Sequence, residues 1–132
     1  MNVSMWVKAL RIIPRLSGEE WKNLDIISRW LVSTRAAVLV MTFFSAAIAG
    51  LLTALAGEFV LWKWLLLTIG LVFAHATNNL LNDYTDFSRG VDADNYFRTQ
   101  YGVHPLVQGF WTKRQQIRWF LVTGVLAFAS GV

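Results

Sequence analysis

The 132-residue chain is short enough for one domain, carries a formal net charge of +4 and contains no cysteine. Hydrophobic residues make up 55% of it and charged residues 15%, which excludes the composition of an ordinary soluble domain and favours a membrane protein. The lack of cysteine excludes disulfides and thiolate metal sites. Long apolar runs interrupt the basic residues, so the positive charge indicates membrane topology and no nucleic-acid partner is expected.

Residues 1–35 are predicted to form an amphipathic segment on the cytoplasmic surface of the membrane. From Trp6 to Ile13, apolar residues recur at helical spacing with basic residues opposite them, as in an interfacial helix that binds anionic lipid. The apolar residues are Trp6, Ala9, Leu10 and Ile13, and the basic ones are Lys8, Arg11 and Arg15. An amphipathic helix packed on protein would show the same pattern. Pro14 is expected to end or kink this helix.

A second short helix is predicted to begin near Glu19. Ser17 and Glu20 have the spacing of a capping box, in which each side chain bonds a backbone N–H of the first turn. The helix is expected to lead to Trp30, whose indole suits the headgroup layer. One side of it would carry Trp21, Leu24, Ile27 and Ser28.

Two membrane spans follow, over residues 36–57 and 59–81. The first has 22 residues without a formal charge, about 33 Å of helix, which is enough to cross a hydrocarbon core of ~30 Å. Its small residues permit close approach of another helix. They are Ser45, Ala46, Ala47, Ala49 and Gly50. In the second span, Lys63 can extend its amine to the outer surface.

Residues 82–118 are predicted to form a polar, aspartate-rich loop. Because this loop is basic and the link between the two spans is very short, the positive-inside rule places the loop and the N-terminus in the cytoplasm of a multi-pass protein of the cell (inner) membrane. Residues 119–132 are apolar but provide only about 21 Å of helix, so they are interpreted as the start of a third span that is cut off. The alternative is a complete protein with a half-inserted terminal helix.

Polar side chains gather on one face of the second span as it ends. With His75 at zero on a helical projection, Asn79 lies near +40° and Asn82 near −20° at ~100° per residue. Asp86, Asn78 and Asp83 complete this face, near +20°, −60° and +80° by the same ~100° spacing. Such groups are expensive near lipid. The expected result is a polar face toward a central cavity, with His75, Asn78 and Asn79 lining it; the alternative is a polar helix end that leads into a solvated loop.

Grouped carboxylate and amide oxygens suit Mg²⁺, which protein sites typically hold through one or two carboxylates together with substrate phosphate oxygens. A diphosphate is therefore the expected substrate group. Arg89, Lys113 and Arg114 lie near enough in sequence to bind it.

These residues carry a resemblance to a known family. Asn82-Asp83-Tyr84-Thr85-Asp86, then Arg89-Gly90-Val91-Asp92, then Pro105-Leu106 with Gly109, resemble the first aspartate-rich motif of the UbiA superfamily of membrane prenyltransferases. The sequence of this motif is most similar to that of the branch that makes menaquinone precursors, the 1,4-dihydroxy-2-naphthoate prenyltransferases.

The resemblance implies an all-α, multi-pass helical membrane bundle, of which this chain would hold the first two spans and the start of a third. It also implies a Mg²⁺-dependent site that binds a prenyl diphosphate and an aromatic acceptor. Asn82, Asp86 and Asp92 would be the catalytic residues, and the same three with Asp83 would bind the metal. Asp92 follows Asp86 by six residues where the family pattern has four, and His104 stands where many members have arginine.

The implied reaction is ionisation of an allylic prenyl diphosphate and capture of the cation by an aromatic ring. The family also uses a second aspartate-rich motif on later spans, which this sequence lacks, so residues 1–132 are expected to be inactive by themselves. Competing hypotheses are a small non-catalytic membrane protein whose acidic loop binds a cation or a partner, and an enzyme of this type with a different acceptor, such as a polar lipid headgroup or another quinone precursor.

Overall fold

The computed structural model describes residues 2–91 and 102–131, and across these ranges the chain is helical and contains no strand. Two helices, α4 (Ala36–Leu55) and α5 (Leu61–Ser88), are long and apolar enough to cross a membrane. The predicted all-α fold with two membrane-spanning helices is therefore confirmed.

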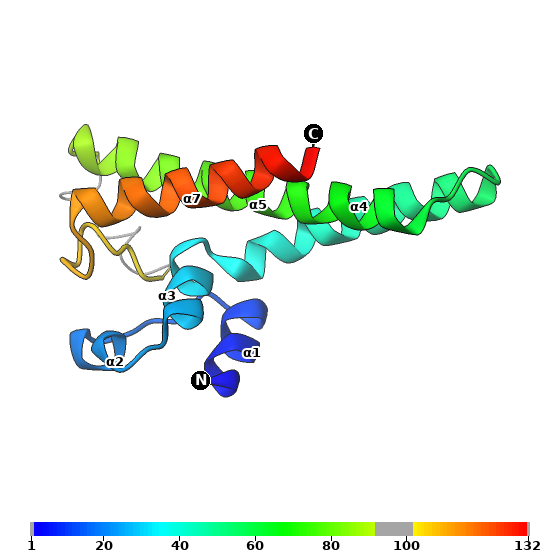
Figure 1. The fold of residues 1–132 in the computed structure, drawn as a ribbon. Coiled ribbons are helices and arrows are strands. Elements are labelled where there is room, and N and C mark those ends of the chain that lie inside the picture. Colours follow the sequence, from blue (N-terminus) through cyan, green and yellow to red (C-terminus); the bar gives the residue numbers. More distant parts are fainter. Residues whose placement is uncertain (1, 92–101, 132) are drawn as a thin grey trace.

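Helices α4 and α5 form a long antiparallel hairpin that extends away from the rest of the molecule (Figure 1). They contain 20 and 28 residues, or about 30 and 42 Å of helix at ~1.5 Å per residue. The turn between them contains Gly57, whose φ of +76° is a conformation that glycine adopts without strain. Helix α5 continues to Ser88, seven residues past the expected end of the span at residue 81.

Small residues of α4 allow α5 to approach closely, as predicted. The indole Nε1 of Trp64 donates a hydrogen bond to the carbonyl of Ala46 at 2.7 Å. A Cβ added to Gly50 would lie 2.5 Å from that same indole nitrogen. Glycine at position 50 is therefore required for this contact.

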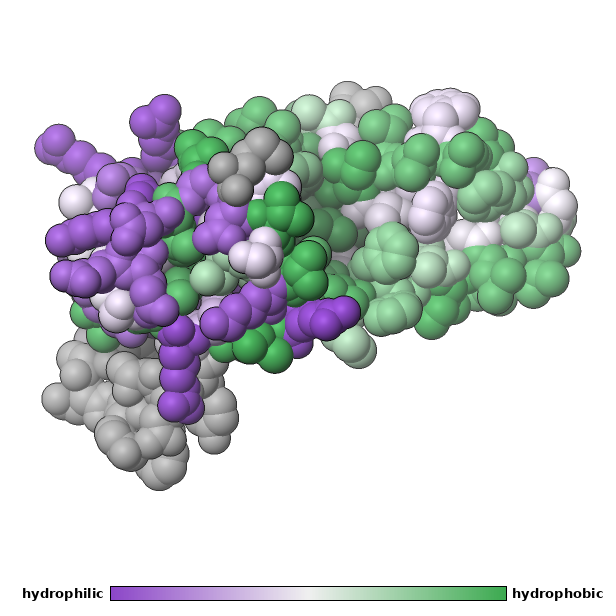
Figure 2. Space-filling view, turned by 90° about the horizontal axis from the view of Figure 1, so that it is seen from below, coloured by the Kyte–Doolittle hydropathy of each residue, from purple (hydrophilic) through white to green (hydrophobic). Residues whose placement is uncertain are grey.

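The hairpin has an apolar exterior. Large side chains along it are well exposed, including Met41 at 66%, Ile48 at 60% and Leu55 at 77%. Viewed from the side of the N-terminal helices, apolar residues cover the extended end, whereas hydrophilic side chains gather at the opposite end (Figure 2). Lipid hydrocarbon is the environment in which such a surface is stable.

Three short helices precede the hairpin: α1 (Val3–Arg11), α2 (Gly18–Lys22) and α3 (Ile26–Ser33). Helix α1 ends at Arg11, three residues before Pro14, and the predicted capping box of α2 is present, with both reciprocal bonds between Ser17 and Glu20. The prediction of one helix from Glu19 to Trp30 was wrong. Asp25 accepts a hydrogen bond from the backbone N–H of Ser28 at 2.9 Å and so begins a new helix.

Helix α7 (Lys113–Gly131) lies along α5 (Figure 1). It begins six residues before the expected start of the third apolar segment at Trp119. The amide Nε2 of Gln116, which is fully buried, donates to the carbonyl of Leu80 at 2.9 Å and so ties the start of α7 to α5.

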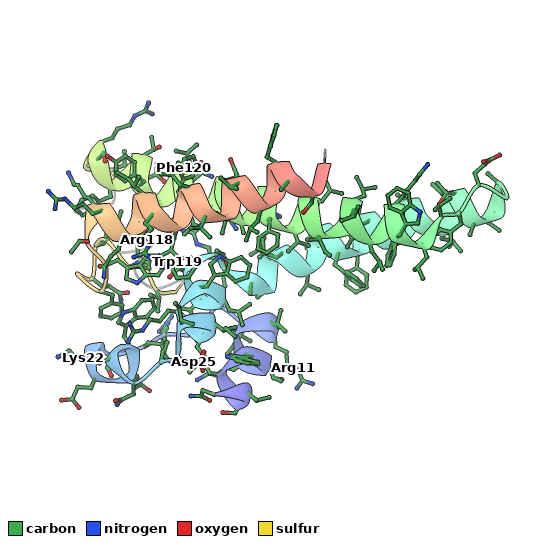
Figure 3. All side chains as sticks on the ribbon, viewed as in Figure 1. Arg11, Lys22, Asp25, Arg118, Trp119 and Phe120 are labelled. Carbon is green, nitrogen blue, oxygen red and sulfur yellow. The ribbon has the colours of Figure 1, made fainter. Side chains whose placement is uncertain are left out.

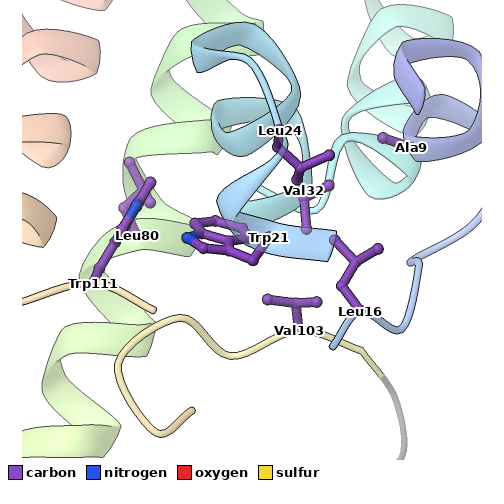
Figure 4. Close-up of a cluster of buried hydrophobic side chains, with 8 residues drawn as sticks. All are labelled: Ala9, Leu16, Trp21, Leu24, Val32, Leu80, Val103 and Trp111. Atoms are coloured by element: carbon purple, nitrogen blue, oxygen red, sulfur yellow. The ribbon is translucent and has the colours of Figure 1, made fainter. Parts of the chain in front are cut away.

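A small core joins these helices at the hydrophilic end of the molecule (Figure 4). It combines Trp21 of α2, Leu80 of α5, and Val103 and Trp111 from the segment before α7. The rings of Trp21 and Phe110 stack with their centroids 5.1 Å apart. The N-terminal segment is thus packed against the polar end of α5 and the residues that lead into α7.

Candidate functional site

The polar face of α5 consists of two adjacent rows of side chains. Residues 75, 79 and 83 form the first row and residues 78, 82 and 86 the second, each with a spacing of four residues, about one helical turn. The structure places these rows in different surroundings, because α4 and the joint between α3 and α4 pack against the first row.

The first row bonds to protein groups. Nδ1 of His75 lies 2.6 Å from the hydroxyl of Thr42 on α4. The amide of Asn79 is buried and donates to the carbonyl of Thr34 at 2.8 Å. These two members of the expected cavity lining therefore hold α5 against α4 and the α3–α4 joint, whereas Asn78, the third member, is exposed.

Asp83 completes the first row. It is 1% exposed and forms an ion pair with the guanidinium of Arg35, which immediately precedes α4. Arg35 has a left-handed backbone with φ of 55°, an uncommon conformation for a residue with a Cβ, at the sharp change of direction between α3 and α4. The Arg35–Asp83 pair therefore fixes this joint on α5.

His104 lies near the same carboxylate oxygen of Asp83 as Arg35. Its Nε2 is 3.9 Å from Oδ1 of Asp83, and its Nδ1 accepts a hydrogen bond from the backbone N–H of Val107 at 3.3 Å. With Nδ1 as an acceptor, the proton of the neutral ring is on Nε2, on the side of Asp83. His104 is 4% exposed, so it contributes to the buried support of the acidic motif.

The second row is open to solvent. Asn78 and Asn82 are exposed and Asp86 is half-buried near the end of α5. Asn82 and Asp86 are separated by one helical turn on the same face, so an amide oxygen and a carboxylate can approach one ligand together. These two members of the predicted site come together in the structure.

Cationic side chains lie at the same end of the molecule. Arg89 is the C-cap of α5 and is exposed, as are Lys113 and Arg114 in the first turn of α7. The amine of Lys113 is 5.4 Å from the ring centroid of Phe87, the residue after Asp86. The packing of α7 therefore brings one predicted phosphate-binding cation beside the last acidic turn of α5.

The oxygen donors of the second row are of the type that Mg²⁺ prefers, but they are too few to complete its coordination. Within residues 2–91 and 102–131, no cluster of three or more histidine, aspartate or glutamate side chains is placed to hold a metal ion. Asn82 and Asp86 would supply two oxygens, which matches a cation that keeps several water molecules and binds substrate phosphate oxygens. Asp92, the remaining predicted ligand, and its neighbour Asp94 lie outside the described residues.

Comparison with protein families decides the identity of the chain. The model of the UbiA prenyltransferase family matches residues 33–132, which is most of the sequence. The chain belongs to the UbiA prenyltransferase family. No curated protein and no solved structure matched it.

As a UbiA family member with two apolar helices of spanning length, the chain is a membrane protein. The family match begins at Ser33, so it includes the α3–α4 joint as well as both polar rows of α5. Sequence reasoning did not find Thr34 and Arg35 as partners of the motif. The signal that the sequence offered was the position of Arg35 immediately before a charge-free span. The positive-inside rule explains a cation there as well as an ion pair with the motif does.

Proposed function

We propose that this UbiA family protein transfers a prenyl group from an allylic prenyl diphosphate to an aromatic acceptor. The acceptor would be a quinone precursor of the 1,4-dihydroxy-2-naphthoate type, used in menaquinone biosynthesis, and the site would face the cytoplasm at the inner membrane. The sequence of residues 82–92, which resembles the motif of the dihydroxynaphthoate branch, supports this class of acceptor. The observation that supports the proposal is the amine of Lys113, a predicted phosphate-binding cation, which lies 5.4 Å from the ring centroid of Phe87, the residue after Asp86.

Asn82, Asp86 and Asp92 would hold Mg²⁺ in this proposal. When bound, Mg²⁺ supplies positive charge that stabilises diphosphate as a leaving group. The sequence also predicts Asp83 as a ligand, but its carboxylate is paired with Arg35. We therefore assign Asp83 the task of positioning α5, so that Asn82 and Asp86 present their oxygens toward the substrate.

Arg89, Lys113 and Arg114 would bind the oxygens of the diphosphate. The bond between C1 of the prenyl chain and the diphosphate oxygen breaks, and its electron pair stays with the diphosphate. The allylic cation then forms a bond to an electron-rich ring carbon, which afterwards loses its proton and regains aromaticity. The cationic side chains favour this reaction because they stabilise negative charge as it develops on the leaving group.

The same proposal holds residues 1–132 to be inactive by themselves. The family resemblance implies a second aspartate-rich motif, and this sequence contains one such motif, at residues 82–92. Assays should therefore compare the full-length protein with the segment 1–132. Prenyl transfer by the segment would contradict this part of the proposal.

Substitution of the second-row ligands tests the enzyme. We expect Asp86→Ala and Asn82→Ala in the full-length protein to lower Mg²⁺-dependent prenyl transfer by at least ~10²-fold while membrane insertion is retained, since each removes an oxygen that faces the reacting charge. The measurement is product formation from radiolabelled prenyl diphosphate and dihydroxynaphthoate. Glu58→Ala is the control, because it removes an exposed carboxylate from the opposite end of the hairpin. Full turnover by Asp86→Ala would refute the assignment of Asp86.

The choice of acceptor needs its own experiment. Full-length protein incubated with dihydroxynaphthoate, a hydroxybenzoate and a polar lipid headgroup is expected to prenylate the first. Transfer to another member of the panel would keep the family reaction and change the pathway. A protein that transfers to none, with or without Mg²⁺, would support a non-catalytic role for the acidic loop.

A further inference from the structure

A groove of about 420 Å³ lies between α3 and α7 at the hydrophilic end of the molecule. Arg29 of α3 and Arg118 of α7 line it, together with Gln115, Trp111 and Trp119. Figure 3 shows Arg118 and Trp119 on the side of α7 that faces the N-terminal helices, whereas Phe120 lies on the other side. We name this hollow the interfacial groove. It is separate from the second row of α5, none of whose residues lines it.

The interfacial groove carries positive charge that no described residue of its lining balances. Within residues 2–91 and 102–131, no carboxylate lines it. One terminal nitrogen of Arg29 donates to the carbonyl of Lys22 at 2.9 Å, and its Nε is buried without a hydrogen-bond partner. Arg118 is exposed. Across the described ranges, neither guanidinium forms an ion pair. That of Arg29 lies 5.9 Å from the ring centroid of Trp21, a contact that leaves its positive charge without a counter-ion.

An apolar hollow of about 250 Å³ continues the groove. The two share Ile26, Trp119 and Val122, and the apolar hollow then extends to Phe73 of α5 and Leu126 of α7. Arg118, Val122 and Leu126 are spaced by four residues on one face of α7, so this face runs from a cation to apolar side chains over about 12 Å. A ligand that fits both parts has an anionic head and a hydrocarbon tail.

We propose that the interfacial groove binds an anionic phospholipid of the surrounding membrane. The phosphate would lie between the guanidinium groups of Arg29 and Arg118, which suit phosphate oxygens, and an acyl chain would follow Val122 and Leu126. Trp119 fits the headgroup layer, where indole rings are enriched. A covering protein helix would have to supply acidic partners for two arginines, whereas an anionic lipid brings this charge with it.

The test uses the full-length protein in neutral detergent micelles, with lipid binding counted by native mass spectrometry. We expect phosphatidylglycerol to bind at least about tenfold more tightly than phosphatidylcholine with the same acyl chains. Arg118→Gln and Arg29→Gln should each lower the affinity for phosphatidylglycerol about fivefold and leave that for phosphatidylcholine unchanged. Arg118→Gln is the safer variant, because Arg29 also holds the carbonyl of Lys22. Lys63→Gln, an exposed cation near the start of α5 at the far end of the hairpin, is the control and should keep the preference.

A second variant tests the tail. Val122→Trp should fill the apolar hollow and weaken the binding of both lipids. Its thermal unfolding midpoint should stay within a few degrees of that of the unchanged protein. Equal affinity for the two lipids in the unchanged protein, or a full preference retained by Arg118→Gln, would overturn the proposal. Displacement of phosphatidylglycerol by inorganic pyrophosphate would identify a soluble-anion site instead, and one-for-one displacement by a prenyl diphosphate would assign the groove to substrate; either result would also overturn it.

Discussion

Asp83 and Asp86 lie three residues apart on α5, but their surroundings differ. Asp83 is buried against Arg35 and His104, whereas Asp86 is half-buried in the open row with Asn82. A buried carboxylate is costly once its counter-charge is removed, while the partly exposed cation can be reached by water. The side chain of Arg35 is 26% exposed and that of Asp83 is 1% exposed. The cost of breaking the pair should therefore depend on which partner is lost.

We expect Arg35→Gln to lower the free energy of unfolding by about 3 kcal/mol, because it leaves the Asp83 carboxylate buried without its cation. Asp83→Asn should cost less, about 1 kcal/mol, and the double variant should cost less than the sum. Denaturant unfolding of the protein in micelles measures all three. Arg89→Gln, at an exposed cation, is the control and should stay within about 0.5 kcal/mol. Additive effects, or a larger cost for Asp83→Asn, would contradict the assigned role of the pair.

The sequence predicted the polar residues of this site but not how they divide. A helical projection puts His75, Asn79, Asn82 and Asp86 on one face. It contains no information on which neighbours pack there, so it cannot divide this face into a buried row and an open row. The division depends on Thr34 and Arg35, which are more than 40 residues away from Asn79 and Asp83 along the chain. Only the packing of the α3–α4 joint brings them together. Asp92, the third catalytic residue of the hypothesis, lies outside the described residues and stays a prediction.

At the scale of elements, the contact between α4 and α5 depends on the absence of a side chain at Gly50. We expect Gly50→Ala to destabilise the hairpin by about 2 kcal/mol, since its Cβ would displace the Trp64 indole and break the hydrogen bond to Ala46. Gly124→Ala is a matched control at the α5–α7 contact, where the added Cβ would meet Thr77 at an ordinary 3.6 Å. The same unfolding assay should show little change for it.

The same substitution in a variant that lacks the Trp64 indole tests the steric explanation directly. In a Trp64→Ala variant the indole is gone, so Gly50→Ala should then cost close to nothing. If Gly50→Ala destabilised the hairpin equally with and without Trp64, the steric explanation would be wrong.

Helices were predicted well and their ends less well. A charge-free run indicates a span, but the polar residues after position 81 do not stop α5, because its carbonyls and N–H groups continue to bond within the helix to Ser88. The earlier start of α7 had a readable signal. Thr112 and Gln115 bond each other's backbone N–H groups at 3.2 and 2.8 Å, a capping box of the same form as the one at Ser17 and Glu20.

At the scale of the whole molecule, Asp25 connects α1 to α3. Its carboxylate accepts hydrogen bonds from the backbone N–H of Asn2 at 2.6 Å, from the indole of Trp6 at 3.2 Å, and from the backbone and hydroxyl of Ser28. The sequence contains each of these residues but not their convergence, which depends on the folded path between α1 and α3. The bond from the Ser28 backbone N–H is the main cause that lowers the pKa of Asp25 to about 2, and the bonds from Asn2 and Trp6 add to it.

This pKa predicts how the attachment of α1 depends on pH. Because the folded-state pKa lies below the ordinary value of 3.8, the ionised carboxylate stabilises the contact fully above pH 3.8, and the contribution is lost as the pH falls through about 2. The indole N–H resonance of Trp6 in micelles should therefore shift with a midpoint near 2, and a Trp6→Phe variant assigns that resonance. Asp25→Asn should abolish the shift across this range. A midpoint near 3.8 in the unchanged protein would show that the carboxylate does not hold α1 and α3 together.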